Sequence, residues 1–182
     1  VTGVQTCALP ISRQTALDLI SSNGKITISQ IEKSIRARTA NGQIHITAAS
    51  DTIEANTSNG QIIIQQSPAV SLDLHTSNGA IRCEDITGHI NASTSNGFVN
   101  VRYAPNADPA TDIHITTSNG AIALKTPEHY SAKVDAATSN GNIHTAVPII
   151  AQGEIGNNVK GVINGGKGQL YLRTSNSSIN IQ

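Results

Sequence analysis

Six histidines are the side chains of this sequence best suited to hold a metal ion. A zinc site needs three or four ligands that converge on one point, usually at short and regular spacings. No two of the histidines fall at the same position of neighbouring copies of the short repeat that fills the chain. They are His45, His75, His89, His114, His129 and His144. We therefore expect outward-facing polar residues, with no bound metal and no cofactor.

Carboxylates could support a second chemistry, the hydrolysis of glycosidic bonds by a pair of acidic side chains at a fixed separation. Glu84 and Asp85 are adjacent in one connection, whereas Asp108, Asp112 and Glu128 lie in or beside proline-rich connections. Such positions are typical of solvated loops. We expect no catalytic residues and no enzymatic activity, and a polysaccharide-acting enzyme remains the alternative.

Two further binding chemistries are disfavoured by the sequence. The segment NGGKG places Gly168 after Lys167, where a phosphate-binding loop needs Ser or Thr. Twelve Lys and Arg residues balance twelve Asp and Glu residues, so the chain has no basic excess for nucleic acid. We expect a loop or a terminal turn of the fold at NGGKG, and no nucleic-acid partner.

The elements that position these residues come from an internal repeat. The tetrapeptide TSNG occurs five times, at residues 57–60, 76–79, 94–97, 117–120 and 138–141, and variants of it occur elsewhere. The marker asparagines are Asn23, Asn41, Asn59, Asn78, Asn96, Asn119, Asn140 and Asn176, at steps of 18, 18, 19, 18, 23, 21 and 36 residues. Because 36 is twice 18, we expect a degenerate copy near Asn158. A fixed period of this length indicates a repeat architecture.

Apolar and polar residues alternate on both sides of each asparagine. The sixth residue before it is always aliphatic, as in Ile53 and Ile90, and so is the third residue after it, as in Ile62 and Val99. Alternation with a period of two is the signature of strands with one buried face. Each copy is therefore predicted to be a strand, a turn and a second strand, in an all-β protein.

Two all-β architectures fit this alternation. In an antiparallel meander, Asn-Gly would form a two-residue hairpin turn, which explains only two letters of the motif. In a β-solenoid, successive copies stack, and each side chain lies over its counterpart in the next copy. We predict a right-handed parallel β-helix of about 18–21 residues per repeat with Asn-Gly corners, because parallel crossovers are strongly right-handed.

The solenoid assigns a role to every letter of TSNG. Thr and Asn are expected to point inward as hydrogen-bonded ladders, Ser to face water, and Gly to adopt a left-handed corner conformation. The predicted structural ladder comprises the eight marker asparagines together with Thr39, Thr57, Thr76, Thr94, Thr117, Thr138 and Thr174.

The connections opposite the Asn-Gly corner are where the copies differ most. The longest is RYAPNADPATD, residues 102–112. Variable loops on a regular scaffold are common recognition sites. We consider it a candidate binding loop for a surface ligand, either glycan or protein, with Arg102, Tyr103, Asn106, Asp108 and Asp112 as candidate contacts.

The first eleven residues, VTGVQTCALPI, resemble a translated sequencing adapter, so we assign residues 1–11 as an artefact and residues 12–182 as one solenoid domain. On this interpretation the native N-terminus is missing. Membrane association would then depend only on the missing segment. With Cys7 assigned to the artefact, Cys83 has no disulfide partner.

From about Ala16 to Gln182, the TSNG copies and the closing run GVINGGKGQLYLRTSNSSINIQ resemble a family of bacterial domains of unknown function that carries an adhesin label. The resemblance implies a β-helix fold and a location at the cell envelope or outside the cell. It supplies no catalytic residues. We expect a non-catalytic surface adhesin or scaffold, with a polysaccharide-acting enzyme or a purely structural spacer as alternatives.

Overall fold

The computed structural model describes residues 12–151 and 156–182, and these residues form strands and turns without any helix. None of the described residues therefore belongs to a helix that could cross a membrane. The adapter interpretation concerns residues 1–11, which lie outside the described part of the chain.

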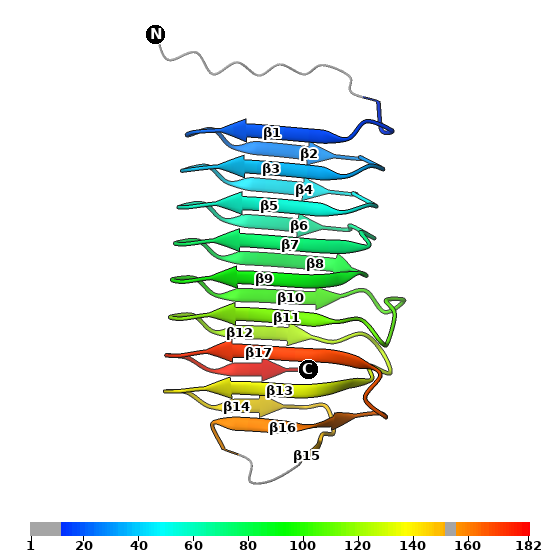
Figure 1. The fold of residues 1–182 in the computed structure, drawn as a ribbon, viewed down its shortest axis with the longest axis vertical. Coiled ribbons are helices and arrows are strands. Elements are labelled where there is room, and N and C mark those ends of the chain that lie inside the picture. Colours follow the sequence, from blue (N-terminus) through cyan, green and yellow to red (C-terminus); the bar gives the residue numbers. More distant parts are fainter. Residues whose placement is uncertain (1–11, 152–155) are drawn as a thin grey trace.

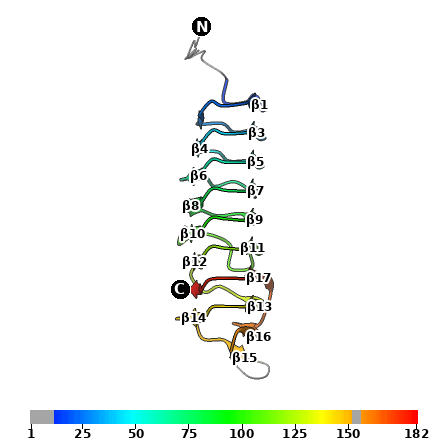
Figure 2. The ribbon, with the colours of Figure 1, turned by 90° about the vertical axis from the view of Figure 1, so that its left-hand side faces the viewer.

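The strands alternate between two sheets that face each other (Figures 1 and 2). The ten-stranded sheet contains β1 (Leu17–Ser21), β3 (Ile35–Thr39), β5 (Ile53–Thr57), β7 (Ser71–Thr76), β9 (His89–Thr94), β11 (Ile113–Thr117), β13 (Ala132–Thr138), β15 (Ile150–Ala151), β16 (Asn158–Ile163) and β17 (Gly168–Thr174). The eight-stranded sheet contains β2 (Ile26–Ser29), β4 (Ile44–Thr47), β6 (Ile62–Gln65), β8 (Ile81–Ile86), β10 (Val99–Tyr103), β12 (Ile122–Lys125), β14 (Ile143–Thr145) and β18 (Ile179–Ile181).

One strand from each sheet makes one rung, for example β5 with β6, and the rungs stack in parallel register. Ile53 pairs with Leu72 in one sheet, and Ile62 pairs with Ile81 in the other. In Figure 1 the chain runs to the left along the front sheet, returns behind it and descends, which is a right-handed path. The predicted parallel β-solenoid is confirmed.

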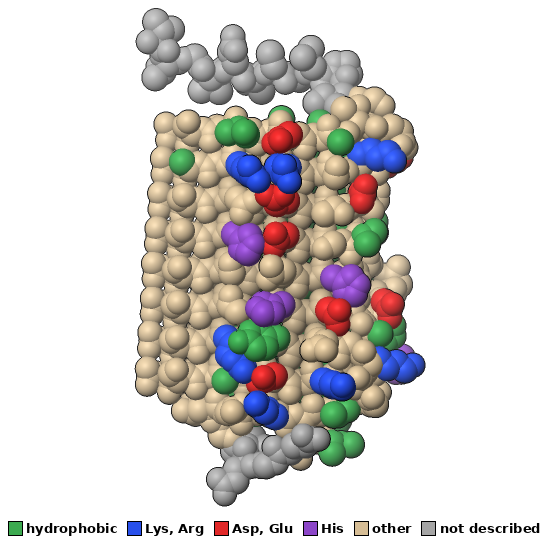
Figure 3. Space-filling view, viewed as in Figure 1, with side chains coloured by type: hydrophobic (Ala, Val, Ile, Leu, Met, Phe, Trp, Pro, Cys, Tyr) green, Lys and Arg blue, Asp and Glu red, His purple; other side chains and the backbone are tan. Residues whose placement is uncertain are grey.

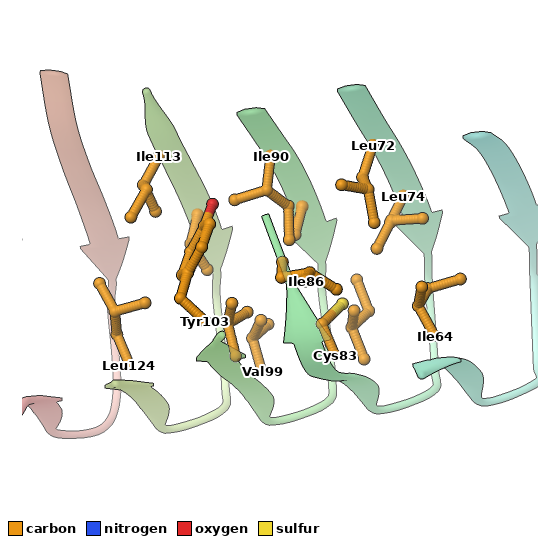
Figure 4. Packing of buried hydrophobic residues seen from close by; sticks show 14 of the residues in the cluster. Ile64, Leu72, Leu74, Cys83, Ile86, Ile90, Val99, Tyr103, Ile113 and Leu124 are labelled. Carbon is orange, nitrogen blue, oxygen red and sulfur yellow. The ribbon is translucent and has the colours of Figure 1, made fainter. Parts of the chain in front are cut away.

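The core fills the narrow space between the two sheets. Most strands bury alternate side chains, and Figure 4 shows Ile64, Leu72, Cys83 and Ile90 from successive strands between the two sheets. Burying one such side chain contributes about 1.5–3 kcal/mol, whereas ordering each residue of backbone costs about 1–2 kcal/mol. A single rung is therefore unstable alone, and stability depends on stacking.

The order of the rungs departs from the order of the sequence at the C-terminal end. Strand β17 lies between β11 and β13, and β18 lies between β12 and β14, so the last copy of the repeat is inserted between two earlier ones (Figure 1). The chain passes β13 and β14, forms β15 and β16, and then returns to fill the gap.

The prediction of a degenerate repeat copy near Asn158 is therefore wrong. Asn158 begins β16, which pairs antiparallel with β13 instead of adding a parallel rung. Strand β15 pairs antiparallel with β16 in turn. The step of 36 residues thus holds an antiparallel extension of one sheet, because the path back to β17 must reverse direction.

Candidate functional site

The Asn-Gly corner is the most repeated polar feature of the molecule, and its threonines lie inside it. The seven threonines of the motif from Thr39 to Thr174 are buried, with 5–7% of their surface exposed. Each hydroxyl donates to a backbone carbonyl of the neighbouring rung, as in Thr76 Oγ1 to the Gly60 oxygen at 3.0 Å and Thr94 Oγ1 to the Gly79 oxygen at 2.9 Å. These bonds satisfy a buried carbonyl where the strand ladder ends.

The corner asparagines do not point inward, so that expectation is wrong. All eight are exposed. Each amide nitrogen from Asn41 onward donates to the amide oxygen of the preceding rung at 2.7–2.9 Å. The row runs through the inserted rung, because Asn176 donates to Asn119 and Asn140 donates to Asn176. The backbone turns outward at this residue, and the amides hydrogen-bond along the surface.

The corner glycines also differ from expectation, because none of them has a positive φ. Their requirement is close packing of the backbone. A Cβ on Gly79 would lie 1.8 Å from the Gly60 oxygen, and a Cβ on Gly97 would lie 1.9 Å from the Gly79 oxygen. Left-handed residues occur instead at the opposite corner, where Ala48 and Gln66 have φ values of 54° and 49°.

The candidate loop after β10 packs its aromatic residue into the core. Tyr103 is 3% exposed, and its hydroxyl donates to the Gly88 oxygen at 3.0 Å. Figure 4 shows the ring among core side chains. Burial raises the pKa of this phenol well above its usual range. Tyr103 therefore cannot contact a surface ligand, and this part of the predicted binding site is wrong.

The other four residues of the candidate loop are exposed but do not form one cluster of contacts. Asp108 Oδ1 accepts the Ala110 amide at 2.8 Å. Asp112 Oδ1 accepts the amide of Gln169 at 2.8 Å, which ties the loop to the inserted strand β17. Asn106 makes no side-chain hydrogen bond to the described residues. Arg102 projects instead from β10 onto the outer face of the eight-stranded sheet.

A hydrogen-bonded set of Asp73, His75 and Ser93 was not anticipated from the sequence. His75 Nε2 lies 2.8 Å from Asp73 Oδ1, and His75 Nδ1 lies 2.5 Å from Ser93 Oγ. Asn91 also donates to Asp73 at 2.8 Å. These residues occupy adjacent outward rows of neighbouring rungs, and that placement could have been found by aligning the repeats.

Ser93, His75 and Asp73 are hydrogen-bonded in the same order as the nucleophile, base and carboxylate of a catalytic triad, but the resemblance stops there. Acyl transfer also needs donors aimed at the developing oxyanion, and backbone amides usually supply them. The backbone groups of β7 and β9 are engaged in the parallel ladder with neighbouring strands. The side chains of His75 and Asp73 are 39% and 45% exposed. We interpret the set as a bridge between rungs.

Ion pairs and one pair of stacked rings lie on the outer face of the ten-stranded sheet, where Figure 3 shows charged and histidine side chains gathered in the middle and right of the view. The Glu54 carboxylate forms ion pairs with Arg36 Nε at 2.8 Å and with Arg38 Nη2 at 2.7 Å. Hydrogen bonds from Arg38 and then from Arg36 hold the pKa of Glu54 below its usual range. Arg173 pairs with Asp135 at 2.8 Å. The charges of these three arginines are therefore neutralised by carboxylates on the same face.

Within the described residues, no group of three or more His, Cys, Asp or Glu side chains is placed to hold a metal ion. His114 stacks on Tyr171, with ring centroids 4.4 Å apart. Burial, followed by the nearby Arg173 charge, lowers the pKa of His114. Cys83 is a free buried thiol whose pKa is raised by burial, so it is not a reactive nucleophile.

The two facing parallel sheets and their repeated corner define the protein as a β-solenoid. Residues 6–182 match the family described as Toastrack DUF4097, and the chain belongs to this family of unknown function. No curated protein and no solved structure matches the chain significantly. The match includes residues 6–11, so it gives no support to the adapter interpretation.

Proposed function

We propose that this protein is a non-catalytic scaffold or adhesin of the bacterial cell envelope. The main support is the unbroken stack of corners, in which a Thr hydroxyl to carbonyl bond and an Asn-to-Asn bond recur from Gly24 to Asn140. Repetition of one structural bond along the molecule suits a rigid body that holds its faces apart and in fixed register.

The structural use of the polar side chains supports this proposal over the enzyme alternative. Most of the polar side chains that the sequence offers for catalysis make structural contacts, including Glu84, which accepts Gln65 Nε2 at 3.0 Å. The Asp112 carboxylate accepts the Gln169 amide, and the Asp112 backbone amide donates to His89 Nδ1. Changing them is expected to affect folding more than any reaction.

Location and attachment can be tested in the bacterium that carries the gene. The full reading frame with an epitope tag should fractionate with the envelope, and a protease added outside intact cells should remove the tag if the domain is displayed. Deletion of the gene should reduce attachment of cells to a matrix or to one another. Recovery of the tagged protein only from the cytosol would exclude the proposal.

Activity on a panel of polysaccharides provides the separate test of the enzyme alternative. We expect no reducing ends to be released. Release that is abolished by Glu84→Gln or Asp108→Asn, in a variant whose circular dichroism shows an intact fold, would instead establish an enzyme.

A further inference from the structure

A shallow depression lies on the outer face of the eight-stranded sheet, across β10, β12 and β18. Its side chains are Asn100, Arg102, Ala123, Lys125, Asn180 and Gln182. Four of these residues come from strands β10 and β12, and the other two are among the last three residues of the sequence. The inserted rung therefore creates the site.

The depression exists because a small residue stands in a row of larger ones. Ala123 pairs with Asn100 on one side and with Asn180 on the other. The equivalent residues of earlier rungs are Ile63 and Arg82. The two amides therefore flank an open floor, and neighbouring strands are about 4.8 Å apart, so the site spans about 10 Å.

Two cations stand side by side at one edge of this floor. Arg102 and Lys125 are register partners on β10 and β12, and both are exposed. Among the described residues neither side chain has a hydrogen bond or an ion pair. Glu84 is the register partner of Arg102 on the other side, but its carboxylate accepts Gln65 instead. Like charges directly opposite each other destabilise a sheet, so the pair is unfavourable for folding alone.

The rest of the surface makes this pair unusual. On the opposite sheet Arg36, Arg38 and Arg173 all contact carboxylates. At the N-terminal end of the same face, His45 bonds to Gln65, which bonds to Glu84. The depression therefore brings two cations that have no ion pair among the described residues next to three amide side chains.

We propose that this depression binds a segment of an acidic polysaccharide. Arg102 and Lys125 would pair with uronate carboxylates, because charge-assisted bonds to carboxylate are the strongest that these side chains form in water. Asn100, Asn180 and Gln182 would bond to ring hydroxyls, since an amide can both donate to and accept from a hydroxyl.

A carbohydrate fits these residues better than a phosphate surface. Three amides beside two cations suit a ligand in which hydroxyls outnumber charges, whereas binding to anionic lipid depends on clusters of about four to eight basic residues. The chain as a whole has a formal net charge of zero, which does not favour nucleic acid.

This inference deepens the proposed surface function by naming a ligand class, but its test does not depend on the location of the protein. Binding of the purified chain to polygalacturonate is measured by calorimetry and on a glycan array. Fully methyl-esterified polygalacturonate is the control ligand, because it keeps the sugar chain and loses the charge. Vesicles with anionic phospholipid and a DNA duplex complete the panel.

Three variants change the proposed site, and a fourth variant is the control. Arg102→Gln and Lys125→Gln should each weaken binding about tenfold, the loss expected for one charged hydrogen bond. Ala123→Ile fills the depression without changing charge and should also weaken binding while leaving the thermal midpoint unchanged or raised. Lys33→Gln removes an exposed cation from a connection elsewhere and should leave affinity unchanged.

Saturable binding to polygalacturonate, absent with the methyl ester and lost in the three site variants, would support the proposal. Failure of every polyuronate to bind would overturn it while leaving the envelope function standing. Binding that all variants retain would also overturn it, as would equal or stronger binding to vesicles or DNA. Circular dichroism of each variant separates loss of the site from loss of the fold.

Discussion

At the scale of single residues, the four letters of TSNG have four different physical roles. Thr buries a hydroxyl against a neighbouring carbonyl, Ser stays exposed, Asn extends a surface row of amides, and Gly allows two backbones to approach. The motif is therefore a structural unit of the corner, and its energetic importance should be highest at Thr and Gly.

Removing the threonine hydroxyl tests the buried bond. Thr76→Val keeps the shape of the side chain but leaves the Gly60 carbonyl without its 3.0 Å partner. We expect the free energy of unfolding to fall by about 1–3 kcal/mol in denaturant titrations. Ser77→Ala, at the exposed neighbouring position, should change it by less than about 0.5 kcal/mol. Equal effects would contradict the assigned roles.

Adding one methyl group at the corner tests the close backbone approach. Gly79→Ala places a Cβ 1.8 Å from the Gly60 oxygen, so the stack must separate locally. We expect a loss of about 3 kcal/mol or more. Gly24→Ala is the matched control, because its nearest neighbour is the movable Ser21 hydroxyl at 2.8 Å. A tolerated Gly79→Ala would show that the rungs are farther apart than described.

The lowered pKa of His114 predicts a dependence of stability on pH. The unfolded chain binds a proton at this residue more readily than the folded chain does, so the stabilising contribution is complete above the unfolded pKa of about 6.5. It should be lost as the pH falls through the lower folded pKa. His114→Gln should reduce the slope of stability against pH below about 6.5. An unchanged slope would exclude His114 as its source.

At the scale of elements, the repeats specify strands well because the period-two pattern and the corner act together. The alternation around Asn59 and Asn78 predicts β5 to β8 closely. It does not predict that the asparagines face outward. The inward and outward alternation of side chains holds only within a strand, and the asparagines lie where the backbone turns. It also cannot reveal the antiparallel β15 and β16, whose residues do not carry the motif.

The inserted rung predicts different effects of shortening the chain at its two ends. Removing residues 164–182 takes away the strand between β11 and β13, so β13 and β14 lose their parallel neighbours. We expect hydrogen exchange to lose protection throughout β11 to β16. Removing residues 1–30 takes away one terminal rung and should leave the remaining protection intact. The opposite pattern would argue against insertion.

The candidate sites were less predictable than the strands. The loop of residues 102–112 was identified by its length, but length alone does not show that Tyr103 fills the core. The depression at Ala123 depends on Asn180, which is 57 residues away in the sequence and becomes a neighbour only through insertion of β18. Sequence periodicity carries no information on that change of order.

At the scale of the whole molecule, the order of the rungs determines which surfaces exist. The stack places β17 and β18 inside it and leaves β15 beside β16 at one end (Figure 1). Both the continuous row of amides and the proposed polysaccharide site require this order. The order is therefore the central claim, and it can be tested without a ligand.

Disulfide cross-linking between exposed corner serines tests it most directly. The Ser175 amide lies 3.2 Å from the Ser118 oxygen, so a chain with Ser118→Cys and Ser175→Cys on a Cys7→Ser background has its thiols on neighbouring rungs within disulfide reach. Ser118 and Ser139 lie on either side of the inserted rung. We predict rapid oxidation of the 118–175 pair and none of the 118–139 pair. Oxidation of the 118–139 pair alone would contradict the fold described for this protein.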